Sequence, residues 1–195
     1  MSKVKSKCLR YGLPIGYLAS GVSLGGTDQK AVAKLATARR DIDVAAFMGA
    51  QLVHVFARGG EAPLDSPEYE PKWAQIVRRM QEMCEYAEKK GMAVGVQNHN
   101  NRSWLMRGEG VLRLLKEVNR ENFTFILDTG QWQGSKGSDP RGVVKDQSNP
   151  DVHEEHIALT APYAAHVRAK MYKLDSGVEE FLPYGRIVKI MRGVN

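Results

Sequence analysis

The sequence predicts an α/β protein in which parallel strands alternate with helices, and three observations support this fold class. Helix-like and strand-like segments follow one another in the order αβαβαβαβαβα. Each strand-like segment is rich in Val, Ile, Phe, Tyr or Leu and follows a helix after a short turn. The 195 residues, 43% hydrophobic and 26% charged, suit one globular domain that buries a core.

Six segments show helical spacing of apolar residues or helix end signals. Glycines such as Gly12, Gly49 and Gly91 follow their last turns, and Pro71 stands at the first position of the clearest one. In chain order the predicted helices are 2–11, from Asp28 to Gly49, from Pro71 to Gly91, a segment that includes 111–118, 150–160 with Asn149 as its N-cap, and 184–191.

Five strands are predicted between these helices, at 13–20, 51–58, 92–99, 123–128 and 164–174. In the last strand, apolar Val167 and Met171 alternate with polar His166, Arg168 and Lys170. An open parallel sheet covered on both faces should not alternate in this way. We therefore expect a (β/α)₈-type barrel, with polar groups gathered inside near the carboxyl ends of the strands.

Charge and composition exclude several classes of protein. The net charge is +6, and the basic residues gather in one stretch only, at residues 3–10, so a nucleic-acid binder is not expected. No apolar run reaches the length of a membrane span, and no signal-peptide pattern precedes Tyr11, so we expect a cytoplasmic protein. The two cysteines, Cys8 and Cys84, do not have the spacing of a zinc site.

Four segments carry a resemblance to a known family: IDVAAFMGAQLVHVFARGG, YAEKKGMAVGVQNHNN, ILDTGQW and AAHVRAKMYKLDSG followed by LPYGRIVKIMRGVN. Through them the chain resembles the xylose isomerase-like TIM barrel superfamily, which contains sugar phosphate isomerases and epimerases. The resemblance implies one domain over residues 1–195, with parallel strands inside and helices outside. It also implies a partial barrel of about five of eight strands, truncated at both ends, so we expect a fragment or a chain that recruits a partner.

The family resemblance implies one divalent metal (Mn, Mg, Co or Zn), held by a Glu, an Asp, a His and a final Glu. Asp128 matches the metal-binding aspartate. Gln97 stands where the metal-binding and catalytic glutamate is expected, and an amide cannot act as a general base. Arg168 stands where the histidine is expected, and a guanidinium repels a cation. The final Glu would lie beyond Asn195, so the metal site is expected to be atypical or lost.

The candidate site residues follow from this comparison and from the strand ends. Asp128, Gln97 and Arg168 are the candidate catalytic residues, and Asp128 is also the candidate metal ligand. The candidate substrate-binding residues are His99, Gln131, Lys170, Arg58 and Trp132. Structural roles stay open for several of them: a loop hydrogen bond for Asp128, or an ion pair between Asp128 and Arg168 or Lys170. His153 and His156, one helical turn apart, are expected on a solvated helix face.

We therefore expect an enzyme of the isomerase/epimerase type, either an intramolecular oxidoreductase or a racemase/epimerase. It would act on a sugar or polyol by proton transfer next to a carbonyl. The alternative is a non-catalytic carbohydrate-binding relative of the same barrel family. An endonuclease acting on DNA ranks last, because the residues for a cluster of several zinc ions are missing. The expected partners are a small-molecule sugar or sugar derivative and, by self-association, a second copy of the chain.

Overall fold

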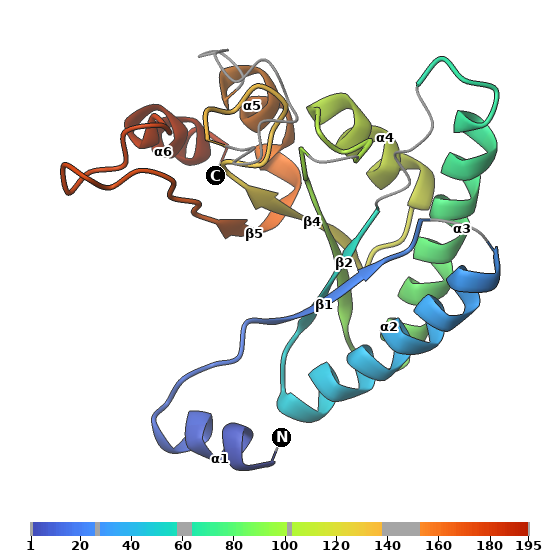
Figure 1. The fold of residues 1–195 in the computed structure, drawn as a ribbon. Helices are drawn as coiled ribbons and strands as arrows, with labels where there is room; N and C mark the ends of the chain where they lie inside the picture. The colour runs from blue at the N-terminus through green and yellow to red at the C-terminus, as the bar shows by residue number, and fades with distance from the viewer. Residues whose placement is uncertain (1, 26–27, 58–63, 101–102, 138–152, 195) are drawn as a thin grey trace. The chain divides into compact units, whose positions relative to one another are not determined.

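The computed structural model describes residues 2–25, 28–57, 64–100, 103–137 and 153–194, and it confirms the predicted alternation of strands and helices (Figure 1). Five parallel strands form one sheet in chain order. These strands are β1 (Tyr17–Ser23), β2 (Leu52–Phe56), β3 (Ala93–Gln97), β4 (Phe123–Asp128) and β5 (Ala164–Arg168).

Within the described residues, six α-helices accompany the strands: α1 (Ser2–Arg10), α2 (Asp28–Met48), α3 (Tyr69–Glu88), α4 (Gly108–Val118), α5 (Ala158–Thr160) and α6 (Tyr184–Arg192). A π-helical turn, His153–Ile157, precedes α5, and a 3₁₀ turn, Ala161–Tyr163, follows it. The start of the predicted helix 150–160, including its cap Asn149, lies outside the described residues. None of the helices in the described part of the chain is long and apolar enough to span a membrane.

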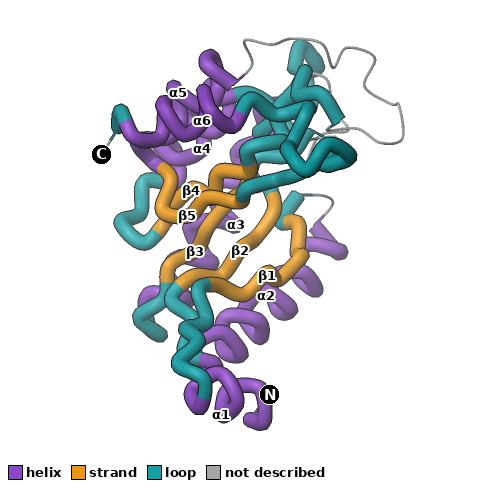
Figure 2. The backbone as a smooth tube through the Cα atoms, turned by 90° about the vertical axis from the view of Figure 1, so that its left-hand side faces the viewer, coloured by secondary structure: helices purple, strands orange, loops and turns teal. Residues whose placement is uncertain are grey.

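The chain divides into two compact units. The first comprises residues 1–96 and 117–124, and the second comprises residues 97–116 and 125–195. In the first unit, α2 lies along β1 and β2 and also contacts α3 (Figure 2). The expected apolar faces meet there: Ala38 and Ile42 of α2 are fully buried, as are Met80 and Cys84 of α3. Apolar spacing therefore identified these core residues, whereas Val32, which was expected on the same face of α2, is 69% exposed.

Four of the five strands have bounds that differ from those predicted, and pairing explains the late start of β1 and the early end of β5. The strand predicted at 13–20 begins only at Tyr17, which is opposite Leu52, the first residue of β2. The strand predicted at 164–174 ends at Arg168, which is opposite Asp128, the last residue of β4. A strand ends where its neighbour offers no further backbone partners. Lys170 and Tyr172 therefore lie in the loop after β5.

The second unit has its core around β4. Phe125, Ile126 and Leu127 are fully buried, together with Trp132 and Ile157. β5 alternates as predicted, with residues 164, 166 and 168 half-buried and residues 165 and 167 exposed. The expectation that helices cover the apolar face of β5 is wrong over the described residues, because α6 packs mainly on the π-helical turn and leaves Val167 39% exposed.

Candidate functional site at the ends of three strands

Three predicted site residues are each the last residue of a strand. Gln97 ends β3, Asp128 ends β4 and Arg168 ends β5. Because the strands are parallel, their carboxyl ends lie at the same edge of the sheet, which is where barrel proteins place their sites. All three residues belong to the second unit. The structure therefore brings together the three residues that the sequence proposed as catalytic.

A continuous chain of hydrogen bonds joins these three side chains, which we call the strand-end cluster. Nη1 of Arg168 donates to Oε1 of Gln97 over 2.7 Å. Nε2 of Gln97 in turn donates to Oδ2 of Asp128 over 3.0 Å. The amide orientation is fixed by its partners, because the guanidinium only donates and the carboxylate only accepts. Arg168 and Asp128 are thus linked through a neutral amide, in place of the direct ion pair considered from the sequence.

Asp128 is the carboxylate of the cluster and is fully buried. Its Oδ1 accepts from the backbone N–H of Gly130 over 3.1 Å, so both of its oxygens have a donor. Burial raises the pKa of Asp128, and the Gly130 hydrogen bond and the charges of Lys170 and Arg168 oppose this shift only in part. A buried carboxylate with a raised pKa is a stronger base than a solvated aspartate.

Asn98 holds the backbone of Asp128 in place, a role that the sequence did not reveal. Its Nδ2 donates to the carbonyl of Asp128 over 2.9 Å, and its Oδ1 accepts from the N–H of Asp128 over 2.8 Å. Asn98 is itself fully buried. The amide therefore pairs the buried N–H of Asp128 and adds a second donor to its carbonyl, which also accepts from the N–H of Gln131 over 3.4 Å.

We expect Asn98→Ala to lower the free energy of unfolding by about 2 kcal/mol, because it leaves the buried N–H of Asp128 unpaired and removes the shorter of the two hydrogen bonds to its carbonyl. Chemical denaturation with urea measures this loss. Asn98→Asp is the matched variant, since it keeps the acceptor and the shape but loses the donor. An Asn98→Ala protein as stable as the wild type would show that the clamp on Asp128 contributes nothing.

A hydroxyl pair connects the ends of β4 and β5 to α6. The N–H of Lys170 donates to Oγ1 of Thr129 over 3.0 Å, and this oxygen lies 2.9 Å from the hydroxyl of Tyr184. Tyr184 also donates to the carbonyl of Lys170. The loop that follows Arg168 is thus anchored at Lys170 by side chains from two elements. Neither Thr129 nor Tyr184 was identified from the sequence.

Gln131, a predicted substrate-binding residue, has a side-chain oxygen that accepts no hydrogen bond from the described part of the chain. Its Nε2 donates to the hydroxyl of Tyr172 over 2.8 Å, and that hydroxyl donates to the carbonyl of Gly130 over 2.9 Å. The Tyr172 hydrogen is therefore committed, and Nε2 is the end of the amide that must face it. Oε1 of Gln131 is buried and has no hydrogen-bond partner among the residues that the structure describes. A sugar hydroxyl is one group that could donate to it.

Gly130 allows the loops after β4 and β5 to pack closely. A Cβ atom at this position would lie 2.7 Å from Cε2 of Tyr172 and 3.0 Å from Cγ of Lys170. Both distances are too short for a side chain, so only glycine fits without displacing its neighbours. Lys170 is held in this way beside the cluster, with its Nζ 5.6 Å from the centre of the Tyr172 ring.

The remaining predicted site residues have different positions. His99 lies half-buried in the loop after β3. Trp132 is fully buried. The centre of its ring lies 6.1 Å from that of Phe125 and 5.4 Å from that of His156, so its ring packs against side chains of the protein. Arg58 lies outside the described residues. Among the substrate-binding candidates, Gln131 and Lys170 therefore lie nearest to the strand-end cluster in the hydrogen-bond network.

The cluster does not fit a divalent metal. Oε1 of Gln97, the one oxygen that this side chain could offer, already faces the guanidinium at 2.7 Å. Both oxygens of Asp128 already accept hydrogen bonds. Metal sites of this kind need several carboxylate or imidazole ligands, and Asp128 alone supplies one.

A second group of side chains has metal-ligand chemistry. One ligand atom each from Glu109, Glu155 and His156 lies within 4.8 Å of the others. The expectation of a solvated face at His153 and His156 is wrong, because the two residues are only 3% and 4% exposed. α6 packs on the π-helical turn that carries them. Nδ1 of His156 accepts from the N–H of Gly108 over 3.4 Å, so this lone pair is directed at the backbone.

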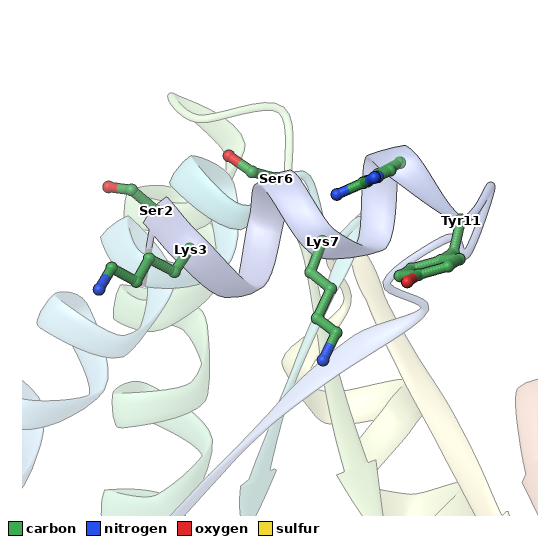
Figure 3. A pocket seen from close by; sticks show the side chains of 6 residues that line it. Ser2, Lys3, Ser6, Lys7 and Tyr11 are labelled. Atoms are coloured by element: carbon green, nitrogen blue, oxygen red, sulfur yellow. The ribbon is translucent and has the colours of Figure 1, made fainter.

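A shallow hollow runs along α1, lined by Ser2, Lys3, Ser6, Lys7, Arg10 and Tyr11 (Figure 3). All six residues come from this helix and the turn that follows it. The lining holds no carboxylate, histidine or cysteine, so it lacks the side chains that usually bind metal ions.

Comparison with known proteins supports the fold. The family model described as "Xylose isomerase-like TIM barrel" matches residues 1–194. No curated protein matches the chain. Solved structures that resemble it include D-allulose 3-epimerase from Methylomonas sp. in complex with D-allulose, with 20% identity and a TM-score of 0.68. The 3-keto-D-glucoside 4-epimerase of E. coli has 15% identity and a TM-score of 0.71.

A third solved relative, a xylose isomerase-like TIM barrel protein from Mycobacterium smegmatis, is in complex with magnesium, with 16% identity and a TM-score of 0.69. The alignments cover 97%, 100% and 98% of this chain, and 63%, 73% and 66% of the Methylomonas, E. coli and Mycobacterium chains respectively. The expected fold, a partial barrel of parallel strands with helices, is confirmed.

Proposed function

Because the chain belongs to the xylose isomerase-like TIM barrel family, we propose that it acts on a sugar or polyol by moving a proton at the carbon next to a carbonyl. The observation that carries this proposal is the strand-end cluster, in which a guanidinium is linked through an amide to a buried carboxylate. Removal of such a proton leaves negative charge on the carbonyl oxygen, which needs a cationic partner, and the proton needs a base.

Each residue has a separate task in this reaction. Arg168 and Lys170, both half-buried at the carboxyl ends of the strands, stabilise the negative oxygen of the enediolate. Asp128 takes the proton as the C–H bond breaks and its electron pair moves toward the carbonyl oxygen. It then delivers the proton to the former carbonyl carbon, while the proton of the neighbouring hydroxyl passes to the enediolate oxygen and a new carbonyl forms. For this step Oδ2 of Asp128 exchanges the hydrogen bond from Gln97 for the substrate proton. Gln131 accepts a hydrogen bond from a substrate hydroxyl at Oε1.

The second candidate function is sugar binding without catalysis. It is favoured by the environment of Asp128, which is fully buried and has a donor on each oxygen. Gln97 cannot serve as the base in its place, because an amide does not take up a proton at neutral pH. Under this alternative Arg168, Lys170 and Gln131 keep their contacts with the ligand, and Asp128 only orients Gln97.

Solvent hydrogen exchange separates the two candidates. The chain is incubated in D₂O with D-allulose, D-fructose or D-tagatose, and NMR follows deuterium at the carbons next to the carbonyl. We expect incorporation that Asp128→Asn abolishes and that Asp175→Asn, a change at an exposed aspartate, leaves intact. Saturation-transfer NMR on the same samples detects binding. Binding without exchange would favour the sugar-binding alternative, and the absence of both would reject a site for these ketoses.

A further inference from the structure

We propose that the strand-end cluster works without a divalent metal, and that the guanidinium of Arg168 takes the place of the cation. This inference deepens the proposed function and relies on it only for the identity of the ligand. It concerns the three side chains Gln97, Asp128 and Arg168, whose contacts all lie within one compact unit.

The oxygens that a metal ion would need as ligands already accept hydrogen bonds. A metal held by this cluster would need Oε1 of Gln97 and an oxygen of Asp128. The first accepts a charge-assisted hydrogen bond from Nη1 of Arg168 over 2.7 Å. The second accepts from Nε2 of Gln97 over 3.0 Å. A metal ion held by both oxygens would therefore have to displace both hydrogen bonds of the amide.

The positive charges around Asp128 also disfavour a divalent cation at this position. Asp128 is the carboxylate of the cluster, and the positive charges of Arg168 and Lys170 both act on it. The negative charge of one carboxylate is thus already matched by neighbouring cations. A divalent ion placed here would face like charges, each costing several kcal/mol at a separation of about 4 Å and an effective dielectric constant of about 20.

A glutamine side chain suits position 97, between Arg168 and Asp128. Its side chain must accept from a guanidinium at one end and donate to a carboxylate at the other, and a carboxamide does both. A glutamate here would place two buried carboxylates in contact, an arrangement that requires a cation between them. Gln97 and Arg168 therefore act as a complementary pair that leaves the cluster without a need for metal.

The ligand class follows from the cation. A guanidinium presents N–H donors in a planar fork and carries a single, permanent charge. It suits an oxygen that carries one negative charge, such as an enediolate or a carboxylate oxygen. Lys170, held beside the cluster by Tyr184 and Gly130, supplies a second positive charge to the same anion.

The test is the binding of Mn²⁺ to the full chain, followed by electron paramagnetic resonance without any sugar. We expect no stoichiometric site that depends on Asp128, so wild type and Asp128→Asn give the same titration. Glu109→Gln identifies any ion held instead by Glu109, Glu155 and His156. A stoichiometric Mn²⁺ site that weakens tenfold or more in Asp128→Asn would overturn the proposal. Because no sugar is present, this outcome is independent of whether the proposed reaction occurs.

A gain of binding provides the second measurement. The double change Gln97→Glu with Arg168→His supplies a carboxylate and an imidazole beside Asp128, so we expect Mn²⁺ to bind at least about tenfold more tightly than to wild type. Circular dichroism first establishes that this variant is folded. A folded double variant that binds Mn²⁺ no better than wild type would contradict the claim that this pair excludes the metal. If the variant does not fold, the comparison of wild type with Asp128→Asn decides alone.

Discussion

Replacing Arg168 with methionine is expected to weaken the binding of a sugar ligand by about 100-fold. A hydrogen bond to a charged group is worth about 1.5–3 kcal/mol, and each 1.4 kcal/mol is a factor of about 10 in affinity. The variant loses the guanidinium that faces the ligand, and it also frees Oε1 of Gln97 to rotate away from its present position. Isothermal titration calorimetry with the ketose that binds wild type measures the loss.

Two further variants make this result specific. Arg168→Lys keeps a positive charge but lacks the planar fork, so we expect a smaller loss of about tenfold. Arg107→Met is the matched control, because Arg107 also donates to a glutamine side chain, Gln133, over 2.7 Å, but at an exposed position. We expect the control to bind like wild type. Equal losses in Arg107→Met and Arg168→Met would show that the effect is not specific to the cluster.

The part of the site that the sequence predicted depends on strand periodicity. The apolar run that ends in Asp128 predicted both ends of β4 correctly. The alternation in the last strand placed Arg168 on its polar face. Parallel strands then bring their carboxyl ends to one edge. Gln97 and Arg168 were selected through the family resemblance, because the predicted strands ran on to residues 99 and 174. What periodicity did not supply was the bonding, in which Gln97 stands between the two charged groups.

The residues that the sequence did not reveal act on the backbone. Asn98 pairs with the peptide groups of Asp128, and Tyr184 approaches Thr129 from 55 positions further along the chain. An asparagine after a strand is typical of many loops, and a tyrosine in an amphipathic helix is typical of a core, so neither has a distinctive sequence pattern.

The prediction for His153 and His156 was wrong for a different reason, because polar side chains were expected to be exposed. His153 is 3% exposed, and neither ring nitrogen has a hydrogen-bond partner in the described part of the chain. Burial lowers the pKa of His153 to about 4. The backbone of Thr129 opposes this shift, while the positive charge of Arg186 adds to it. Because the packing of α6 creates this environment, helical spacing of His153 and His156 could not predict it.

A large acid sensitivity follows from this burial. The unfolded chain binds a proton at His153 below pH 6.5, whereas the folded chain resists protonation until about pH 4. Unfolding therefore takes up a proton in this range, so the contribution of His153 to stability is complete above pH 6.5 and is lost as the pH falls toward 4. At about 1.36 kcal/mol for each unit of pKa shift, the free energy of unfolding should fall by about 3 kcal/mol between pH 7 and pH 4.

Urea denaturation at a series of pH values tests this expectation in three proteins. His153→Phe keeps an aromatic ring, cannot be protonated and leaves no ring nitrogen unpaired, so we expect its stability to vary with pH by about 3 kcal/mol less than that of wild type. His153→Gln serves if the phenylalanine ring overpacks the site. His166→Gln, a change at a half-exposed histidine of β5, should retain the steep acid loss of wild type. If His153→Phe lost stability in acid as steeply as wild type, the acid loss would come from the protonation of other groups. That result would contradict the assignment of the acid loss to the buried, neutral imidazole of His153.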